Sequence, residues 1–181
     1  MMEDLSLHIL DITENGIAAG AKRISIVINE NKKKDLLTIR VSDNGRGMSK
    51  DTLRRALDPF FSTKGKATGL GLALLAQAAE HCGGGLAIAA AYGKGTKVAA
   101  RFQYGHIDRP PLTSMAVTIA TLVLGHPEVD FFYRHRRDGR VYRFDGRRLT
   151  QGLGASAGLD PAAIAAVKSE LKAGLRRIGR T

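Results

Sequence analysis

Asp11 and Asn15 are four residues apart in a segment with helical periodicity, so their side chains lie on one face of a helix. A carboxylate and an amide oxygen are hard ligands of the kind that Mg²⁺ accepts, and Mg²⁺ takes its other ligands from water and substrate phosphates. We therefore predict that Asn15 binds a magnesium ion and that Asp11 is a base that aligns an attacking water or hydroxyl. On these two residues alone, the alternative is a solvated helix face without chemistry.

A glycine-containing turn, DNGRGM, follows a segment that is rich in β-branched residues. Its two glycines let the backbone run close to a flat ligand, and Asp43 can accept a hydrogen bond from an exocyclic amine such as that of adenine. We predict that Asp43, Gly45, Gly47 and Met48 form the end of the site that binds the base. The alternative is a plain turn, in which Asp-Asn-Gly is also common.

A second glycine-rich run, TGLGLALL, opens the helix predicted over 70–81. Backbone amides at a helix N-terminus and the positive end of its dipole can hold phosphate oxygens. Thr68, Gly69, Leu70 and Gly71 are therefore predicted to bind the phosphates of a nucleotide. The alternative is a glycine loop that is needed only for a tight turn.

Two weaker signals flank this helix. Lys64 lies in the loop DPFFSTKGKATG before the helix and can close over a triphosphate as part of a lid. Thr96 in GKGTKV begins a predicted strand, where its hydroxyl can reach the base through water. Taken alone, Thr96 is equally an ordinary strand residue.

These residues need a scaffold of alternating helices and strands. A helix is predicted over 5–21 because Leu7, Leu10, Ile17 and Ala21 recur at short helical steps. The expected strands are 23–28, 36–43, 86–92 and 96–104, with a short helix opened by Ser49 and a longer helix at 70–81. This order predicts an α/β (α+β) two-layer sandwich, with helices on one face of a mostly antiparallel sheet.

The composition changes after Gly105, so we predict two units, residues 1–104 and residues 105–181. The second unit begins with the stiff Pro110-Pro111 connector and is expected to contain a helix, an arginine-rich hairpin turning at Asp138-Gly139, and an amphipathic helix that starts at Pro161. That last helix carries one apolar stripe, which predicts that it docks on the rest of the chain.

Composition limits the classes of function. The single cysteine, Cys82, excludes an intramolecular disulfide and a cysteine-rich metal site, and the 44% apolar content indicates a folded core. The net charge of +11 favours anionic partners. The N-terminus lacks the features of a signal peptide, and the most apolar later stretch, 115–124, is about half the length of a membrane span. We therefore expect a cytoplasmic protein without membrane contact.

Together and in this order, Asn15, DNGRGM, DPFFSTK, TGLGLAL and GKGT resemble the nucleotide-binding pattern of the GHKL superfamily, whose ATPases include gyrase, histidine kinases and MutL. DPFFSTK and GLGLAL are similar to the histidine-kinase catalytic domain, and ENGIAAGAKRISIVI is similar to MutL. The resemblance covers residues 1–104. It implies the Bergerat (histidine-kinase-like ATPase) sandwich, ATP and Mg²⁺ as cofactors, and a lid anchored by Phe60.

Two departures from the family pattern concern activity. Four residues before the metal-binding Asn, the hydrolysing branches have Glu and histidine kinases commonly have Asn, whereas this chain has Asp11, so hydrolysis is expected to be slow or absent; Glu14 is the second candidate acid. The first predicted helix starts at the beginning of the chain, which leaves no room for a phosphoacceptor hairpin, and His8 is expected to pack or to lie on the surface. A phosphoacceptor would then belong to another protein.

Three functions follow as hypotheses. The first is a stand-alone ATP-dependent kinase or ATPase regulator, acting on a partner protein bound through residues 105–181. The second is a nucleotide sensor that binds ATP and catalyses little. The third, a MutL-like ATPase that binds nucleic acid through the hairpin FFYRHRRDGRVYRFDGRR, is the least favoured, because alternation of aromatic and basic residues is ordinary in a half-buried hairpin. The oligomeric state stays open.

Overall fold

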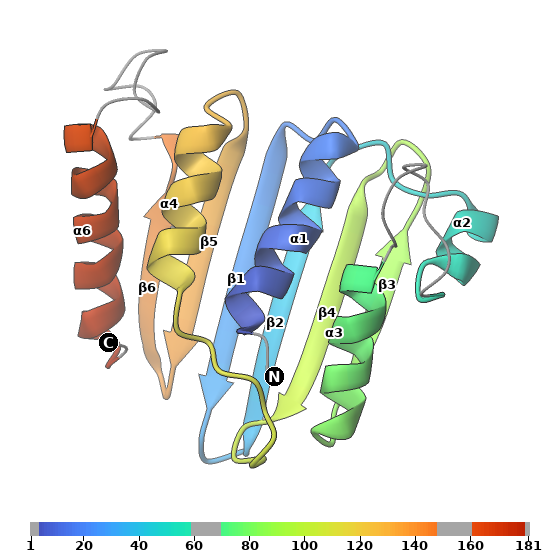
Figure 1. Cartoon of the computed structure of the whole chain (residues 1–181), viewed down its shortest axis with the longest axis horizontal. Coiled ribbons are helices and arrows are strands. Elements are labelled where there is room, and N and C mark those ends of the chain that lie inside the picture. The colour runs from blue at the N-terminus through green and yellow to red at the C-terminus, as the bar shows by residue number, and fades with distance from the viewer. Residues whose placement is uncertain (1–3, 59–69, 148–160, 180–181) are drawn as a thin grey trace.

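The computed structural model describes residues 4–58, 70–147 and 161–179 of the chain, which form one sheet with helices packed against it (Figure 1). Its elements in chain order are α1 (Leu5–Ala18), β1 (Arg23–Asn31), β2 (Leu36–Asp43), α2 (Lys50–Arg55), α3 (Leu70–His81), β3 (Gly85–Ala90), β4 (Thr96–Gln103), α4 (Met115–Gly125), β5 (Asp130–Arg137), β6 (Arg140–Asp145) and α6 (Pro161–Arg177). None of the described helices is long and apolar enough to cross a membrane.

The sheet has six strands in the order β3-β4-β2-β1-β5-β6. Only the β1–β5 pair is parallel, and the other four pairs are antiparallel. The helices α1, α3, α4 and α6 lie over the same face of the sheet (Figure 1). This confirms the predicted two-layer α/β sandwich with helices on one face of a mostly antiparallel sheet.

Residues 105–147 complete the sheet that the first hundred residues begin. The hairpin β5–β6 continues the sheet beyond β1, and Asp138 (φ 47°) and Gly139 (φ 91°) make its turn in the left-handed region, as the Asp-Gly pair predicts. Residues from both parts of the chain, among them Ile24 and Phe131, belong to one hydrophobic core. The two predicted units, residues 1–104 and 105–181, thus share one sheet and one hydrophobic core. Their division into separate units stays a prediction.

The helix α1 is buried mainly through residues that the predicted stripe did not include. Leu5, Ile9 and Ile12 are buried against the sheet, and Leu10 packs beside them. Leu7, which the periodicity placed on the buried face, is 53% exposed, so that part of the prediction is wrong. The steps from 5 to 9 and from 9 to 12 keep one helix face toward the sheet, and residue 7 points about 160° away from that face.

Alternation in β1 reflects a sheet that is covered on one face only. Ile24, Ile26 and Ile28 point toward the helices and are at most 1% exposed. Ser25 and Val27 point to the other face and are half-buried. Each buried isoleucine contributes about 1.5–3 kcal/mol relative to an exposed one, which fixes the register of the central strand.

Glu30 is a fully buried acid near the C-terminal end of β1, on the face that the helices cover. Hydrogen-bonding side chains from β5 offset the cost of burying its carboxylate. His135 Nε2 is hydrogen-bonded to Glu30 Oε1 at 2.6 Å, and His135 Nδ1 is hydrogen-bonded to Tyr133 Oη at 2.7 Å. Arg137 Nε lies 3.9 Å from Glu30 Oε2. A buried charge needs such partners, so this chain joins the central strand to the C-terminal hairpin.

The final helix α6 docks on β6 and α4, as its apolar stripe predicts. Val167, Leu171 and Leu175 are buried, and Gly174 leaves the room that the Tyr142 ring fills. Burial raises the pKa of Tyr142 to about 12. The Tyr142 hydroxyl is buried and has no hydrogen-bond partner within the described residues.

We expect Glu30→Ala to lower the free energy of unfolding by about 3–5 kcal/mol, because it leaves the buried His135 without its carboxylate partner and the half-buried Arg137 without a nearby anion. Urea unfolding followed by circular dichroism measures this loss. Ser25→Ala, on the other face of the same strand, serves as the control and should change stability by about 0.5 kcal/mol or less. Equal losses in the two variants would contradict the role of the buried chain.

We expect Tyr142→Phe to leave the free energy of unfolding unchanged at pH 8, or to raise it by about 1 kcal/mol, because it removes a buried hydroxyl without a partner. The raised pKa means that the folded state holds the phenol proton more tightly than the unfolded state. The stability that the protonated Tyr142 gives the wild-type protein is therefore fully present below pH 10 and is lost as the pH rises toward 12. Urea titrations at pH 8 and pH 11 should show the wild type losing more stability than the variant, and a variant less stable at pH 8 would contradict this.

Candidate functional site

Several predicted site residues lie near the end of the sheet at which β2 ends and β4 begins. The C-terminal half of α1 and the first turn of α3 lie over this edge (Figure 1). The helices α1 and α3 are in direct contact on this face of the sheet, because a Cβ atom at Gly71 would overlap Asp11 Oδ2. Glycine at this position therefore lets the two helices approach.

Asp11 and Asn15 are both exposed on α1, one helical turn apart. The Asp11 carboxylate lies against the first turn of α3 at Gly71. The first turn of a helix carries the positive end of the helix dipole, so it is a place where negative charge is stabilised. In the structure, the Asp11 carboxylate is the group next to this predicted phosphate seat.

Asp43 is fixed between its own turn and α1. Its Oδ1 accepts the N–H of Gly45 at 2.8 Å. A Cβ atom at Gly16 would lie 3.1 Å from Asp43 Cβ and 3.4 Å from its Oδ2. Gly16 directly follows Asn15, so Asp43, the predicted base-binding acid at the end of β2, packs on α1 next to the position of the predicted metal ligand.

Asn44 holds the DNGRGM turn to the start of β1, a role that the sequence analysis missed. Its Oδ1 accepts the backbone N–H groups of Lys22 at 2.9 Å and Arg23 at 2.8 Å. The Asn in an Asp-Asn-Gly turn was the available signal, because Asn side chains commonly bond to backbone amides. The turn is clamped a second time where Arg46 N donates to Ala19 O at 2.9 Å.

The loop that precedes β4 packs directly against the same turn. Gly47 has φ +67°, and a Cβ there would overlap Ala91 O. Gly93 N donates to Arg46 O at 2.7 Å, and Gly95, with φ +78°, lies against Asp43 O. Two glycine loops thus fit together because neither carries a side chain at its contact points.

Thr96 lies opposite Asp43 on the helix-covered face of the sheet. Ser42 pairs with Lys97, so the next positions, Asp43 and Thr96, face one another across β2 and β4. The Thr96 side chain is buried, at 9% exposed. Met48 follows the turn, is half-buried and leads into α2, which Ser49 caps through its Oγ at 3.1 Å from Thr52 N.

Part of the predicted site lies outside the described residues. Phe60, Lys64, Thr68 and Gly69 fall in 59–69, and Leu70 is described only as the first residue of α3. Glu14, the second candidate acid, has its Oε1 3.2 Å from His126 Nε2 at the end of α4. The Glu14 carboxylate is therefore directed to the C-terminal part of the chain. His8, which the sequence predicted to pack or to lie on the surface, is buried.

Asn15 and Asp43 are described side chains whose oxygens could hold a nucleotide with its magnesium ion. Among them, no group of three or more His, Cys, Asp and Glu side chains could hold a metal ion. Mg²⁺ that takes most of its ligands from water and phosphate oxygens needs only one protein oxygen, such as that of Asn15. Gly16 and Gly45 are buried against Asp43, and glycine at both positions leaves room for its side chain.

The family comparison matches residues 3–106 to the histidine kinase-, DNA gyrase B- and HSP90-like ATPase family. This match covers more than half of the chain and includes α1, the DNGRGM turn, α3 and β4.

Among curated proteins, sporulation kinase C of Bacillus subtilis is 37% identical over 87 residues, which are 48% of this chain and 20% of that protein. Sensor histidine kinase ZraS of Escherichia coli K12 is 33% identical over 92 residues, 51% of this chain and 20% of that protein. The chain thus spans about a fifth of the length of these relatives.

Solved structures share the fold at low sequence identity. The N-terminal domain of a DNA repair protein aligns with a TM-score of 0.59 at 16% identity, covering 86% of this chain and 58% of that one. The Aquifex aeolicus MutL ATPase domain complexed with ADP aligns with a TM-score of 0.50 at 19% identity, covering 78% of this chain and 62% of that one. Both alignments extend past residue 106, so the similarity of fold includes part of the C-terminal segment.

We expect Gly47→Ala to destabilise the protein by at least about 2 kcal/mol more than Gly20→Ala, because an added Cβ overlaps backbone only at Gly47. Both glycines have positive φ, 67° and 79°, so both variants carry the same conformational cost of about 1–2 kcal/mol. The pair is therefore matched for backbone strain. Thermal and urea unfolding measure the difference, and equal destabilisation would show that the two loops do not pack as described.

Proposed function

This chain belongs to the histidine kinase-, DNA gyrase B- and HSP90-like ATPase family, and we propose that it binds ATP with Mg²⁺ between α1, the end of β2 and the start of α3. Its family domain is similar to histidine-kinase catalytic domains. The observation that supports the proposal most is the packing of Asp43 on Gly16, which sets a half-buried acid next to Asn15. An adenine-binding group and a metal-binding group are then within reach of one nucleotide.

In the proposed complex, Asp43 Oδ2 accepts a hydrogen bond from the adenine amine while Oδ1 stays bound to Gly45 N. Gly45, Gly47 and Met48 border the base, and Thr96 supports it from β4. Asn15 would hold Mg²⁺, which, when bound, neutralises charge on the phosphate oxygens. The first turn of α3, with Leu70 and Gly71, would receive the phosphates.

The segment 59–69 is proposed to supply the lid. Lys64 would contact the triphosphate, and Thr68 and Gly69 would donate backbone amides to it, with Phe60 as the anchor. These roles follow from the family pattern DPFFSTK and TGLGLAL. The described residues on both sides, α2 and α3, would then form the walls between which the lid closes.

Asp11 decides between a catalyst and a sensor. As a base it would align water or a hydroxyl for attack on the γ-phosphate. Its carboxylate, however, lies against Gly71 at the proposed phosphate seat, where it repels the phosphates that must bind there. This position favours slow turnover and gives the second candidate function, a nucleotide-sensing module, a specific observation in its support.

We further propose that the chain acts in the cytoplasm on a partner protein bound through residues 105–181. A route between the nucleotide site and this region runs along α1. Asn15 and Glu14 are neighbours on that helix, and Glu14 contacts His126 of α4. Ser6 Oγ also accepts a hydrogen bond from the N–H of Ser114, the residue before α4, at 3.2 Å. A shift of α1 on binding ATP would therefore displace α4.

We expect Asp43→Asn to weaken ATP binding about 10- to 100-fold, because an acceptor in a charge-assisted hydrogen bond is lost. Asn15→Ala should weaken binding in the presence of Mg²⁺ and leave binding in EDTA unchanged. Asp108→Asn, in an exposed loop away from the site, is the control for loss of one charge. Calorimetry with ATP, with and without Mg²⁺, measures all three. If the wild-type protein gave no heat of binding with ATP, ADP or AMP, the proposed function would be overturned.

For Asp11→Ala we expect loss of slow ATP hydrolysis together with ATP binding that is equal to or tighter than wild type, because a repelling carboxylate is removed. Release of labelled phosphate measures turnover, and calorimetry measures affinity. Tight binding by a wild-type protein without turnover, alone or with candidate partner proteins, would select the sensor over the kinase or ATPase. Unchanged hydrolysis in Asp11→Ala would exclude Asp11 as the base.

A further inference from the structure

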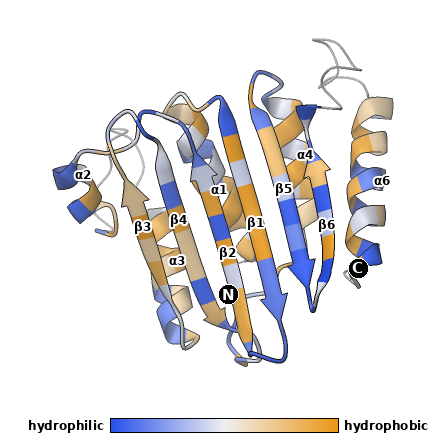
Figure 2. Cartoon of the chain, turned by 180° about the vertical axis from the view of Figure 1, so that it is seen from behind, coloured by the Kyte–Doolittle hydropathy of each residue, from blue (hydrophilic) through white to orange (hydrophobic). Residues whose placement is uncertain are grey.

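The face of the sheet opposite the helices is open in the described part of the molecule. Seen from behind, the strands lie in front and no described helix crosses them (Figure 2). On this face, four exposed arginines line one cavity and come from three strands: Arg40 on β2, Arg134 and Arg136 on β5, and Arg143 on β6. We call these four residues the arginine face.

The strand register sets the arginines in an ordered array. Arg40 and Arg134 both pair with Val27 of β1, and Arg134 pairs with Arg143. One row therefore runs across four strands, from Arg40 to Arg143, over roughly 14 Å, or three strand spacings of about 4.8 Å. Arg136 lies in the neighbouring row beside Asn29.

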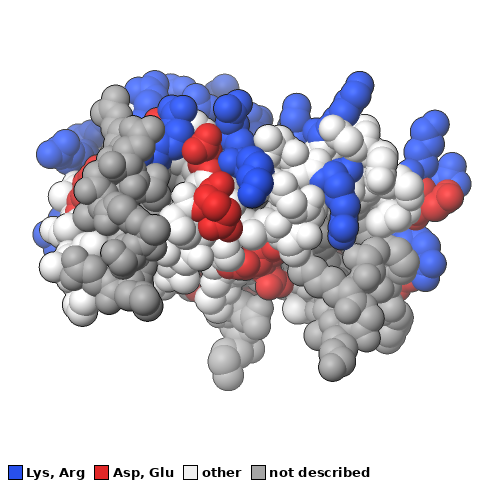
Figure 3. Space-filling view, turned by 90° about the horizontal axis from the view of Figure 1, so that it is seen from above, with Lys and Arg blue, Asp and Glu red and all other residues white. Residues whose placement is uncertain are grey.

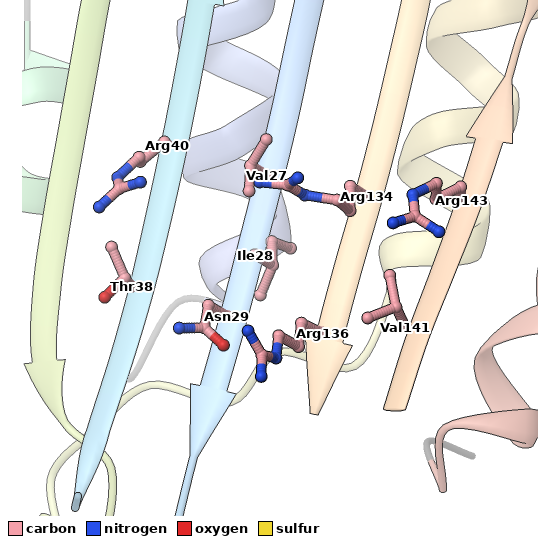
Figure 4. A pocket seen from close by; sticks show the side chains of 9 residues that line it. All are labelled: Val27, Ile28, Asn29, Thr38, Arg40, Arg134, Arg136, Val141 and Arg143. Atoms are coloured by element: carbon pink, nitrogen blue, oxygen red, sulfur yellow. The ribbon is translucent and has the colours of Figure 1, made fainter. Parts of the chain in front are cut away.

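The arginine face borders a cavity of about 310 Å³ whose floor includes Val27, Asn29 and Thr38. The long side chains lie over the sheet, and that of Arg134 extends toward Val27 (Figure 4). In the view from above, Lys and Arg side chains gather along one long side of the molecule (Figure 3). The array is thus part of a broad basic surface on a chain with a net charge of +11.

No carboxylate neutralises this array within the described residues. None of the four guanidinium groups has an ion-pair partner there, and the cavity lining contains no acid. The acids on the same face of β5 and β6 are Asp130, at the start of β5, and Asp145, at the end of β6, so both lie at one end of the hairpin, and Asp145 is held by Arg147 at 2.7 Å. Arginine stays charged at every physiological pH, so paired like charges such as Arg134 and Arg143 cost stability. A bound polyanion would remove that cost.

We propose that the arginine face binds single-stranded nucleic acid through its phosphate backbone. A row of roughly 14 Å is longer than one phosphate can contact, so the ligand carries several anionic groups in series. Guanidinium forks match phosphate oxygens in pairs. Val27 and Val141 offer apolar surface for sugars or bases between the charges.

An acidic peptide fits this face less well than a nucleic acid strand. Peptides that join sheets do so at an edge, where backbone groups are unpaired. The arginine face lies over β2, β1, β5 and β6, and three of these strands are paired on both sides while β6 is an edge strand, so a peptide lying across the row would be held by side chains. A nucleic acid presents a continuous line of charge, and flat sheet faces bind single strands in other proteins.

Binding of a fluorescein-labelled, mixed-sequence 20-nucleotide single-stranded DNA to the full chain tests this proposal by fluorescence anisotropy at several salt concentrations. The test variant is Arg40→Gln/Arg134→Gln/Arg136→Gln/Arg143→Gln. The control removes the same charge from exposed helix positions: Arg54→Gln/Arg55→Gln/Arg176→Gln/Arg177→Gln. We expect the test variant to lose at least tenfold in affinity at 100 mM salt and to reduce the slope of log K against log salt by about 3, four contacts at about 0.7 each. The control should lose much less.

Three outcomes would overturn the proposal: no DNA binding by the wild type at 100 mM salt, equal losses in the two variants, or binding of polyglutamate or duplex DNA as tight as that of the single strand. Tight binding of polyglutamate would identify an acidic protein as the partner instead. The double variants Arg40→Gln/Arg134→Gln and Arg136→Gln/Arg143→Gln, checked by circular dichroism, give the same comparison should the quadruple variant not fold. ATP calorimetry is independent of this result, because no member of the arginine face lies at the nucleotide site.

Discussion

The close contact between Asp43 and Gly16 is the constraint on which the rest of the site depends. It needs a helix without a side chain at position 16 and a strand that ends in an acid directly beneath it. Asn44 and Ala19 then hold the following turn to β1 and to the end of α1. Because these contacts are made by glycines and backbone groups, the site is shaped by the path of the main chain more than by flexible side chains.

A sheet covered on one face gives this small protein two separate candidate surfaces. The helices bury Ile24, Ile26 and Ile28 and, at one end, border the proposed nucleotide site. The opposite face needs no apolar residues, so charge can gather there at little cost to the core. Strand alternation therefore separates the proposed nucleotide site, on the helix-covered face, from the exposed arginine face within the same few strands.

The C-terminal segment is structurally bound to the family domain although the family match ends at residue 106. β5 pairs with β1, and the buried chain from Tyr133 through His135 to Glu30 crosses that junction. α6 closes the end of the layer over β6 and α4. The segment thus protects what would otherwise be the exposed edge of β1, and it is placed to sense changes in α1.

The sequence by itself determined the elements and most of their ends, because hydrophobic period, capping by Ser49 and the Asp138-Gly139 turn are local properties. It also pointed to the family through motifs in a fixed order. Only the tertiary structure decided which side chains meet. Leu7 proved to be exposed, Asn44 proved to anchor the turn, and Arg40 came to lie beside Arg134 from a distant hairpin. Such contacts depend on strand register and helix rotation, where a shift of one residue moves a side chain to another face.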